Sequence, residues 1–156
     1  ARQGGADFYL RKPIQRADLL RFILTAAKPL QHQFRVALVE DSPFVSEAWQ
    51  RCLSASSRIA TCEVEAYASV DEFLARVKDP QYLRTLHLVI TDYWFDQQQL
   101  TGADLARSVR EVSDLPIFLV SEATPLPASE RHLFNATLTK EPLSPFELLL
   151  EWHRAA

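Results

Sequence analysis

The chain has 156 residues, of which 47% are hydrophobic and 24% are charged, and its formal net charge is −3. These values are typical of one soluble α/β domain with an extension, and they offer no basic surface for nucleic acid or for an anionic membrane. Three glycines are too few for a Walker-type phosphate loop or a dinucleotide-binding turn, and no apolar run is long enough to span a bilayer. Two cysteines predict no disulfide framework, so we expect a cytoplasmic protein with buried, reduced thiols.

After the N-terminal segment, strand and helix signals alternate. The first predicted strand covers residues 34–39 and ends at the acidic pair Glu40 and Asp41. Ser42 followed by Pro43 is typical of a helix N-cap and the first helical residue. The next apolar residues recur at helical spacing and predict one apolar helix face: Val45, Ala48, Trp49, Cys52 and Leu53.

A second strand is expected at residues 59–67. Ser69 and Glu72 have the spacing of a capping box, in which each side chain bonds the backbone N–H of the other residue, so they predict the start of a helix. Asp79 and Pro80 predict its end. The apolar face of this helix consists of Phe73, Leu74 and Val77.

The third predicted strand, residues 86–91, ends at Asp92. A loop rich in glutamine then leads to Gly102 and to a further helix. One side of that helix is expected to carry Leu105, Val109 and Val112. The fourth predicted strand, residues 115–120, ends at Ser121.

The C-terminal part of the chain carries weaker signals. Pro125 and Pro127 predict a helix that is short or begins late. Residues 136–139 predict a weak fifth strand that ends at Lys140. A second capping box with proline at the first helical position, residues 144–147, opens a final helix through Leu148, Leu149 and Trp152.

Five strand–helix units with short connections predict a parallel sheet with helices on both faces and right-handed crossovers. The strands are apolar without strict alternation, as expected of a sheet that is buried on both sides. Ligands of such sheets bind beyond the carboxyl ends of the strands. We therefore expect one shared rim for Glu40, Asp41, Asp92, Ser121 and Lys140.

The residue types on this rim indicate phosphoryl chemistry. Clustered carboxylates raise one another's pKa unless a cation lies among them, and Mg²⁺ accepts such oxygen ligands while it keeps several waters. Lys140 supplies a positive charge and Ser121 a hydroxyl donor for phosphate oxygens. A carboxylate such as Asp92, with a metal ion on one side and an ammonium group on the other, is suited to nucleophilic attack on phosphorus.

Each of these residues alone also has an ordinary interpretation. Acidic residues at strand ends are often solvated or act as helix caps, and Asp41 can simply favour the positive end of the following helix. Ser121 alone is typical of a turn, and Lys140 alone of a protein surface. Their coincidence at the ends of four strands favours one functional site.

Short motifs stand at these strand ends: Val-Glu-Asp-Ser at 39–42, Val-Ile-Thr-Asp at 89–92, Thr-Gly at 101–102, Val-Ser at 120–121 and Thr-Lys at 139–140, followed by Pro142. As a set they resemble the receiver domain of response regulators in two-component signalling, over about residues 34–152. The resemblance implies a flavodoxin-like (βα)5 doubly wound parallel sheet with the strand order 2-1-3-4-5. It also implies a phosphoacceptor domain that catalyses phosphotransfer onto itself, rather than a conventional enzyme.

By this resemblance Asp92 is the phosphoacceptor. Mg²⁺ is bound by the side chains of Glu40, Asp41 and Asp92 and by the backbone carbonyl of Trp94. The donor is a histidine kinase or a histidine phosphotransfer protein, and some members of the family accept phosphate from small phosphodonors. The phosphorylated domain then switches a partner or an output domain elsewhere in the full-length chain.

Ser121 and Lys140 bind the phosphoryl group by the same resemblance, and Thr137 takes the position of a switch residue that is normally aromatic. The sequence departs from the family elsewhere as well, and the loop at 93–99 lacks the usual Met-Pro turn. Glu122 stands where a small residue is usual, and Glu141 is inserted into the usual Lys-Pro step after Lys140.

Residues 5–14 carry a second match, with a Lys-Pro step and with Tyr9 in the switch position. They resemble the end of another receiver domain, whose final helix would run through Leu19, Leu20 and Ile23. This implies that residues 1–33 are the tail of a preceding receiver domain with a linker, and that residues 34–156 are the receiver domain. A capped amphipathic extension is the alternative, and its apolar patch is a candidate contact for a homodimer.

Two other functions stay open. The departures at positions 122, 137 and 141 favour a receiver fold that signals by protein contact without phosphorylation, whereas Asp41, Asp92 and Lys140 oppose this alternative. A Mg²⁺-dependent phosphatase or phosphotransferase with an aspartyl nucleophile is the third hypothesis. Such an enzyme needs cap elements that select the substrate, and the connections are mostly too short to build one.

Overall fold

The computed structural model describes residues 32–55, 60–121 and 126–155. Within these ranges lies one five-stranded parallel sheet with the order β2-β1-β3-β4-β5. Its strands are β1 (His32–Val39), β2 (Ala60–Tyr67), β3 (Leu88–Asp92), β4 (Ile117–Val120) and β5 (Ala136–Leu138). The helices are α2 (Pro43–Leu53), α3 (Val70–Val77), α4 (Pro80–Thr85), α5 (Gly102–Arg110), α6 (Pro145–Ala155) and the 3-10 helix η1 (Arg131–Leu133). The predicted flavodoxin-like fold and strand order are confirmed.

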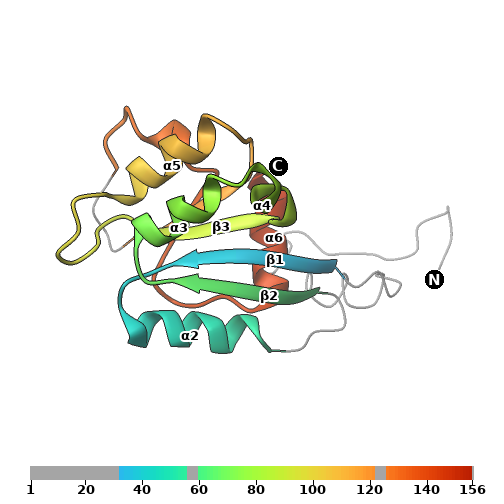
Figure 1. Ribbon diagram of the computed structural model, residues 1–156. Coiled ribbons are helices and arrows are strands. Elements are labelled where there is room, and N and C mark those ends of the chain that lie inside the picture. The colour runs from blue at the N-terminus through green and yellow to red at the C-terminus, as the bar shows by residue number, and fades with distance from the viewer. Residues whose placement is uncertain (1–31, 56–59, 122–125, 156) are drawn as a thin grey trace, which may run out of the picture.

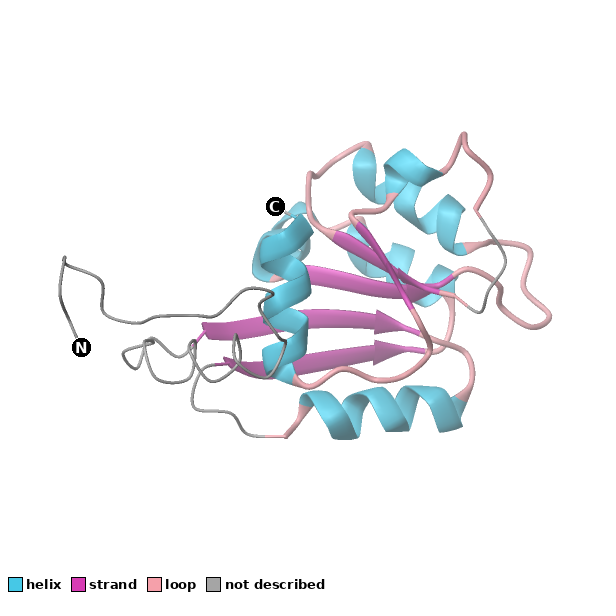
Figure 2. Ribbon diagram, turned by 180° about the vertical axis from the view of Figure 1, so that it is seen from behind, coloured by secondary structure: helices cyan, strands magenta, loops and turns pink. Residues whose placement is uncertain are grey.

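Helices cover both faces of the sheet. Helices α3, α4 and α5 pack on one face (Figure 1), and α2 and α6 pack on the other, where α6 crosses the strands (Figure 2). The chain passes from β1 through α2 to the edge strand β2, and then returns past β1 to reach β3. Because crossovers between parallel strands are right-handed, this change of direction moves the next helices to the opposite face.

Alternate residues of the central strands enter two separate hydrophobic clusters. Ala37, Val39 and Val89 pack with α3, α4 and α5, whereas Val36 and Leu38 pack with α2 and α6. Every residue of β3 and β4 is buried. Burial of one such aliphatic side chain contributes about 1.5–3 kcal/mol, so the central strands are held firmly and their ends are fixed in place.

Side-chain caps start the helices where the sequence predicts them. Ser42 Oγ accepts from the Val45 N–H at 3.4 Å, and Pro43 is the first residue of α2. Ser69 Oγ accepts from the N–H of Glu72 at 3.1 Å, which is one half of the predicted capping box. The second predicted box is complete: the Ser144 N–H donates to Glu147 Oε2 at 3.0 Å, and the Glu147 N–H donates to Ser144 Oγ at 3.3 Å.

Several predicted strand limits are wrong by one or two residues. Strand β1 begins at His32, because its first two residues pair with Ala60 and Thr61 of β2. Strands β3 and β4 begin at Leu88 and Ile117, two residues later than predicted, and β5 ends at Leu138. The residues that precede β3 and β4 include buried leucines, so their apolar character suggested strand although they stand before the ladder.

Helix α4 was not predicted. Asp79 and Pro80 do follow the end of α3, but the same pair starts a new helix, since Asp79 Oδ1 accepts from the Gln81 N–H at 2.9 Å. Tyr82 is buried, and its hydroxyl donates to Glu65 at 2.8 Å. This contact with the edge strand β2 fixes α4 through a tertiary interaction that the local sequence does not reveal.

Two burial predictions need correction. Val112 is 66% exposed, because α5 ends at Arg110 and the chain turns away from the helix face on which Val109 is buried. Cys52 and Cys62 are free, as predicted, but each is only half-buried. Burial nevertheless raises the pKa of the Cys62 thiol to about 11, so it stays protonated at neutral pH.

The predictions for residues 1–31 lie outside the described ranges, so the tail of a preceding receiver domain, the helical extension and the homodimer contact stay predictions. Glu122 and Pro125 also lie outside these ranges. The described part of the next connection contains only the short helix η1 before β5, as the prolines predicted.

Candidate functional site

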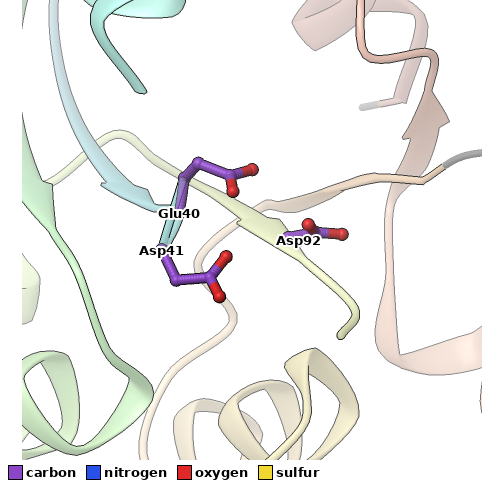
Figure 3. Close-up of side chains that lie close together, drawn as sticks. All are labelled: Glu40, Asp41 and Asp92. Atoms are coloured by element: carbon purple, nitrogen blue, oxygen red, sulfur yellow. The ribbon is translucent and has the colours of Figure 1, made fainter. Parts of the chain in front are cut away.

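The acidic residues of the predicted site lie at the point where the strand order reverses. Glu40 and Asp41 directly follow β1, and Asp92 is the last residue of β3, the neighbour of β1. At such a point the chain leaves toward opposite edges of the sheet, which opens a crevice at the carboxyl ends of the strands. One oxygen from each carboxylate lies within 4.8 Å of the others (Figure 3). These three members of the predicted five-residue rim therefore lie together.

Backbone hydrogen bonds hold the acidic pair in place. Glu40 is 4% exposed, its N–H donates to the carbonyl oxygen of Tyr67 at 3.0 Å, and its Oε1 accepts from the Ser42 N–H at 3.0 Å. Asp41 Oδ2 accepts from the Asp96 N–H at 2.6 Å. The loop after β3 is therefore tied to the end of β1.

Asp92 has a partner on each of its carboxylate oxygens and is 7% exposed. The Tyr93 N–H donates to Oδ1 at 2.7 Å, and Lys140 Nζ lies 3.1 Å from Oδ2. Lys140 follows β5, so its side chain reaches past β4 to the end of β3. The inserted Glu141 does not prevent this contact.

The cluster strongly perturbs Glu40. Burial raises the pKa of its carboxyl from 4.5 to about 7, and the charge of Asp92 and the nearby Asp41 carboxyl add to this rise. The Ser42 N–H and the Lys140 ammonium group oppose the rise without cancelling it. The folded chain therefore keeps a proton that the unfolded chain releases between these two pH values. Without a bound cation, stability is expected to fall as the pH rises through this window.

The donor set fits a hard divalent cation. Three carboxylates offer oxygen atoms around one small space. Burial is the main cause of the raised pKa of Glu40, and a cation there would relieve the repulsion from Asp92 that adds to it. Mg²⁺ prefers oxygen ligands and keeps several of its waters, which suits a rim whose member Asp41 is only half-buried. Glu40, Asp41 and Asp92 would hold the ion, and the predicted contribution of the Trp94 carbonyl stays a prediction.

We predict that Mg²⁺ binds the unphosphorylated chain and changes its tryptophan fluorescence. Trp94 is 68% exposed and stands two residues after Asp92, so its ring reports on the loop beside the site. A saturable change in fluorescence is expected in wild type, and a much weaker one in Asp41→Asn. Glu63→Gln, at an exposed position on β2, should titrate like wild type. No fluorescence change and no heat on calorimetric titration would reject the metal site.

We also predict that Glu40→Gln stabilises the metal-free chain at pH 8. The amide keeps an oxygen acceptor for the Ser42 N–H and removes a buried charge that lies beside two other carboxylates. The free energy of unfolding should rise by about 1–2 kcal/mol in EDTA, measured by urea denaturation. Mg²⁺ should stabilise wild type more than the variant. Equal or lower stability of the variant in EDTA would contradict this view of the cluster.

No family profile and no curated protein matches the sequence. Solved structures do match. The chemotaxis response regulator CheY4 of Vibrio cholerae is 23% identical over 80% of this chain and 99% of that chain, with a TM-score of 0.60. A response regulator receiver protein from Pseudomonas putida is 23% identical over 80% of this chain and 98% of that chain, with a TM-score of 0.55. A probable two-component system response regulator/GGDEF domain protein is 24% identical over 94% of this chain and 59% of that chain, with a TM-score of 0.65.

This chain has the receiver-domain fold. The three aligned structures are all named as response regulators or their receiver proteins, and they share with this chain an arrangement that spans most of its length. At these identities the likeness establishes the fold, and the chemistry of the site has to be argued from its own residues.

Two other predicted site residues lie at or on the neighbouring strands β4 and β5. Ser121 follows Val120, whose Cα pairs with that of Asp92, and the Ser121 N–H donates to the Leu138 carbonyl oxygen at 3.1 Å. Ser121 is therefore at the same rim and half-buried. Thr137 lies on the edge strand β5 and is exposed, so it puts no ring against the site.

Sequence reasoning missed how the residues after Asp92 are anchored. A Cβ atom on Gly102 would lie 2.1 Å from the Asp92 carbonyl oxygen, so the start of α5 can touch the end of β3 only because this residue is glycine. Tyr93 donates from its hydroxyl to Glu130 Oε2 at 2.7 Å, which connects the site to the segment before η1. The Thr-Gly motif was a signal for the first contact, whereas no local pattern pointed to Glu130.

Among residues 32–55, 60–121 and 126–155, no helix combines the length and the apolar character needed to cross a bilayer.

Proposed function

We propose that this chain is a phosphoacceptor receiver domain of a two-component phosphorelay, and that Asp92 takes the phosphoryl group. The observation that carries the proposal is the environment of the Asp92 carboxylate. It is almost fully buried, contacts the Lys140 ammonium group and shares a crevice with Glu40 and Asp41. Asp92 thus lies between the ammonium group of Lys140 and two further carboxylates.

The proposed transfer is a displacement at phosphorus. An oxygen of Asp92 attacks the phosphoryl group of the donor, a P–O bond forms, and the bond from phosphorus to the donor's nitrogen or oxygen breaks. Mg²⁺, when bound, neutralises charge on the phosphoryl oxygens. Lys140, which contacts Asp92, is placed to bind an oxygen of the transferred phosphoryl group. Ser121 offers a hydroxyl donor at the same rim.

The proposal implies a phosphoryl donor and an output domain that the phosphorylated chain would control. The donor would be a histidine kinase or a histidine phosphotransfer protein in the cytoplasm, and the output domain would lie elsewhere in the full-length chain. One aligned structure is a response regulator that also contains a GGDEF domain, which is consistent with a multidomain context. The chain would thus act as a signalling phosphoacceptor and not as an enzyme that turns over a separate substrate.

Labelling with acetyl phosphate tests the proposal directly. After incubation with Mg²⁺, intact-mass analysis should show one added phosphoryl group, and hydroxylamine should remove it because acyl phosphates are labile to nucleophiles. EDTA should prevent the labelling. An unchanged mass in the presence of Mg²⁺, both with acetyl phosphate and with a phosphorylated histidine donor, would reject the function.

A second candidate is a receiver fold that binds a partner without phosphorylation. The exposed Thr137 favours it, because β5 offers no aromatic ring that could change its position after modification of Asp92. In that case beryllium fluoride, a phosphoryl analogue, would not bind in the presence of Mg²⁺. Binding of the analogue would favour the phosphoacceptor function.

A further inference from the structure

Tyr93, the residue that follows Asp92, is held by hydrogen bonds through its backbone and through its side-chain hydroxyl. Its N–H donates to Asp92 Oδ1 at 2.7 Å, and its carbonyl oxygen accepts from the Gly102 N–H at 2.8 Å. Its hydroxyl donates to Glu130 Oε2 at 2.7 Å. The Tyr93 N–H that contacts the Asp92 carboxylate and the Tyr93 hydroxyl that contacts Glu130 belong to the same residue. The position of the ring therefore affects the orientation of this N–H.

Glu130, which anchors the Tyr93 hydroxyl, also forms an ion pair with Arg107. The other oxygen of Glu130, Oε1, accepts from Arg107 of α5 at 2.9 Å, and the Glu130 side chain is only 13% exposed. A carboxylate that is satisfied on both oxygens holds the tyrosine in one position.

These contacts close into a circuit. Arg107 also bonds Asp104 Oδ1 at 3.2 Å, and Asp104 Oδ2 accepts from the Thr101 N–H at 2.8 Å in the capping box of α5. Thr101 precedes Gly102, and the Gly102 N–H donates to the carbonyl oxygen of Tyr93. The end of β3, the start of α5 and the segment before η1 are thereby fixed relative to one another around the peptide that orients Asp92.

We propose that Tyr93 and Glu130 are positioning residues for phosphoryl transfer to Asp92. This inference rests on the proposed function. The Tyr93 N–H occupies Oδ1 and Lys140 occupies Oδ2, so the two contacts together set the plane of the Asp92 carboxylate. Nucleophilic attack requires an oxygen aligned with the breaking bond, and misplacement by about 1 Å can cost on the order of 100-fold in rate. Loss of the anchor at Glu130 loosens the peptide that provides the first of these contacts.

The test compares rates of labelling by acetyl phosphate in Tyr93→Phe, Glu130→Ala and Glu130→Gln. We expect the rate to fall roughly tenfold in Tyr93→Phe and Glu130→Ala, within the range that misplacement can cause. Glu130→Gln keeps an oxygen acceptor for the tyrosine hydroxyl and should recover part of the rate. The Mg²⁺ dissociation constant should stay within about twofold of wild type, because neither residue is a metal ligand.

Tyr82→Phe is the matched control. It removes a tyrosine hydroxyl that also donates to a glutamate, at 2.8 Å to Glu65, but this pair lies at β2 and α4 and does not contact Asp92. It should lower the stability to a similar extent and leave the labelling rate unchanged. If Tyr93→Phe labels as fast as Tyr82→Phe, the positioning role is wrong while the proposed function stands. If wild type itself takes no label, both proposals are wrong.

Discussion

Asp92→Asn should reduce labelling by acetyl phosphate and Mg²⁺ to background, while the chain stays folded. The substitution removes the nucleophilic carboxylate and keeps the size of the side chain and one acceptor oxygen for the Tyr93 N–H. The substitution breaks the ion pair with Lys140 but also removes one of three neighbouring carboxylates, so the free energy of unfolding should change by less than about 1 kcal/mol. Intact-mass analysis measures the labelling, and urea denaturation measures the stability.

Asp96→Asn is the matched control for this experiment. Asp96 is an exposed aspartate four residues further along the same loop, and its contact with Asp41 is made by its backbone N–H, which the substitution retains. It should label at the rate of wild type. Labelling of Asp92→Asn that equals wild type would show that another side chain accepts the phosphoryl group.

Gly102→Ala should both destabilise the chain and slow labelling. The new Cβ would lie 2.1 Å from the carbonyl oxygen of Asp92, which is backbone and cannot move aside as a flexible side chain can. The start of α5 and the end of β3 must separate, and overpacking of this kind costs about 2–3 kcal/mol. Because the displaced atom belongs to Asp92, the labelling rate should fall along with the free energy of unfolding.

Helix propensity predicts the opposite sign, which makes this substitution informative. Replacement of glycine by alanine inside a helix normally stabilises it by up to about 1 kcal/mol. Ala75→Gly, at an exposed position in α3, measures that propensity in the same protein and should leave labelling unchanged. A Gly102→Ala variant with wild-type stability and labelling would mean that α5 and β3 can separate without cost at this point.

The order of the elements could be read from the sequence because the signals that set it are local. The run that ends at Glu40, the run that ends at Asp92 and the serine-proline pair at Ser42 each depend on neighbours within a few residues. A parallel sheet with right-handed crossovers then brings the strand ends to one edge. The acidic rim was therefore predictable from the sequence.

The limits of elements were less predictable, because burial and strand pairing are different properties. Leu86 and Leu115 are buried, yet they precede the ladders of β3 and β4. Tyr82 of α4 donates to Glu65, a residue of strand β2, and this contact holds α4 against the sheet. Such contacts join positions far apart in the chain, and the periodicity of a single segment carries no information about them.

The sequence by itself determined the doubly wound fold and the acidic residues at the ends of its strands, since both follow from local patterns and general rules of chain connection. Only the tertiary structure decided that Lys140 reaches Asp92 in spite of the inserted Glu141, and that Tyr93 is anchored by Glu130. These two contacts span 48 and 37 residues of sequence. Whether they form depends on how the five strands pack side by side. This packing sets the distance between the two backbones, which a side chain of fixed length has to span.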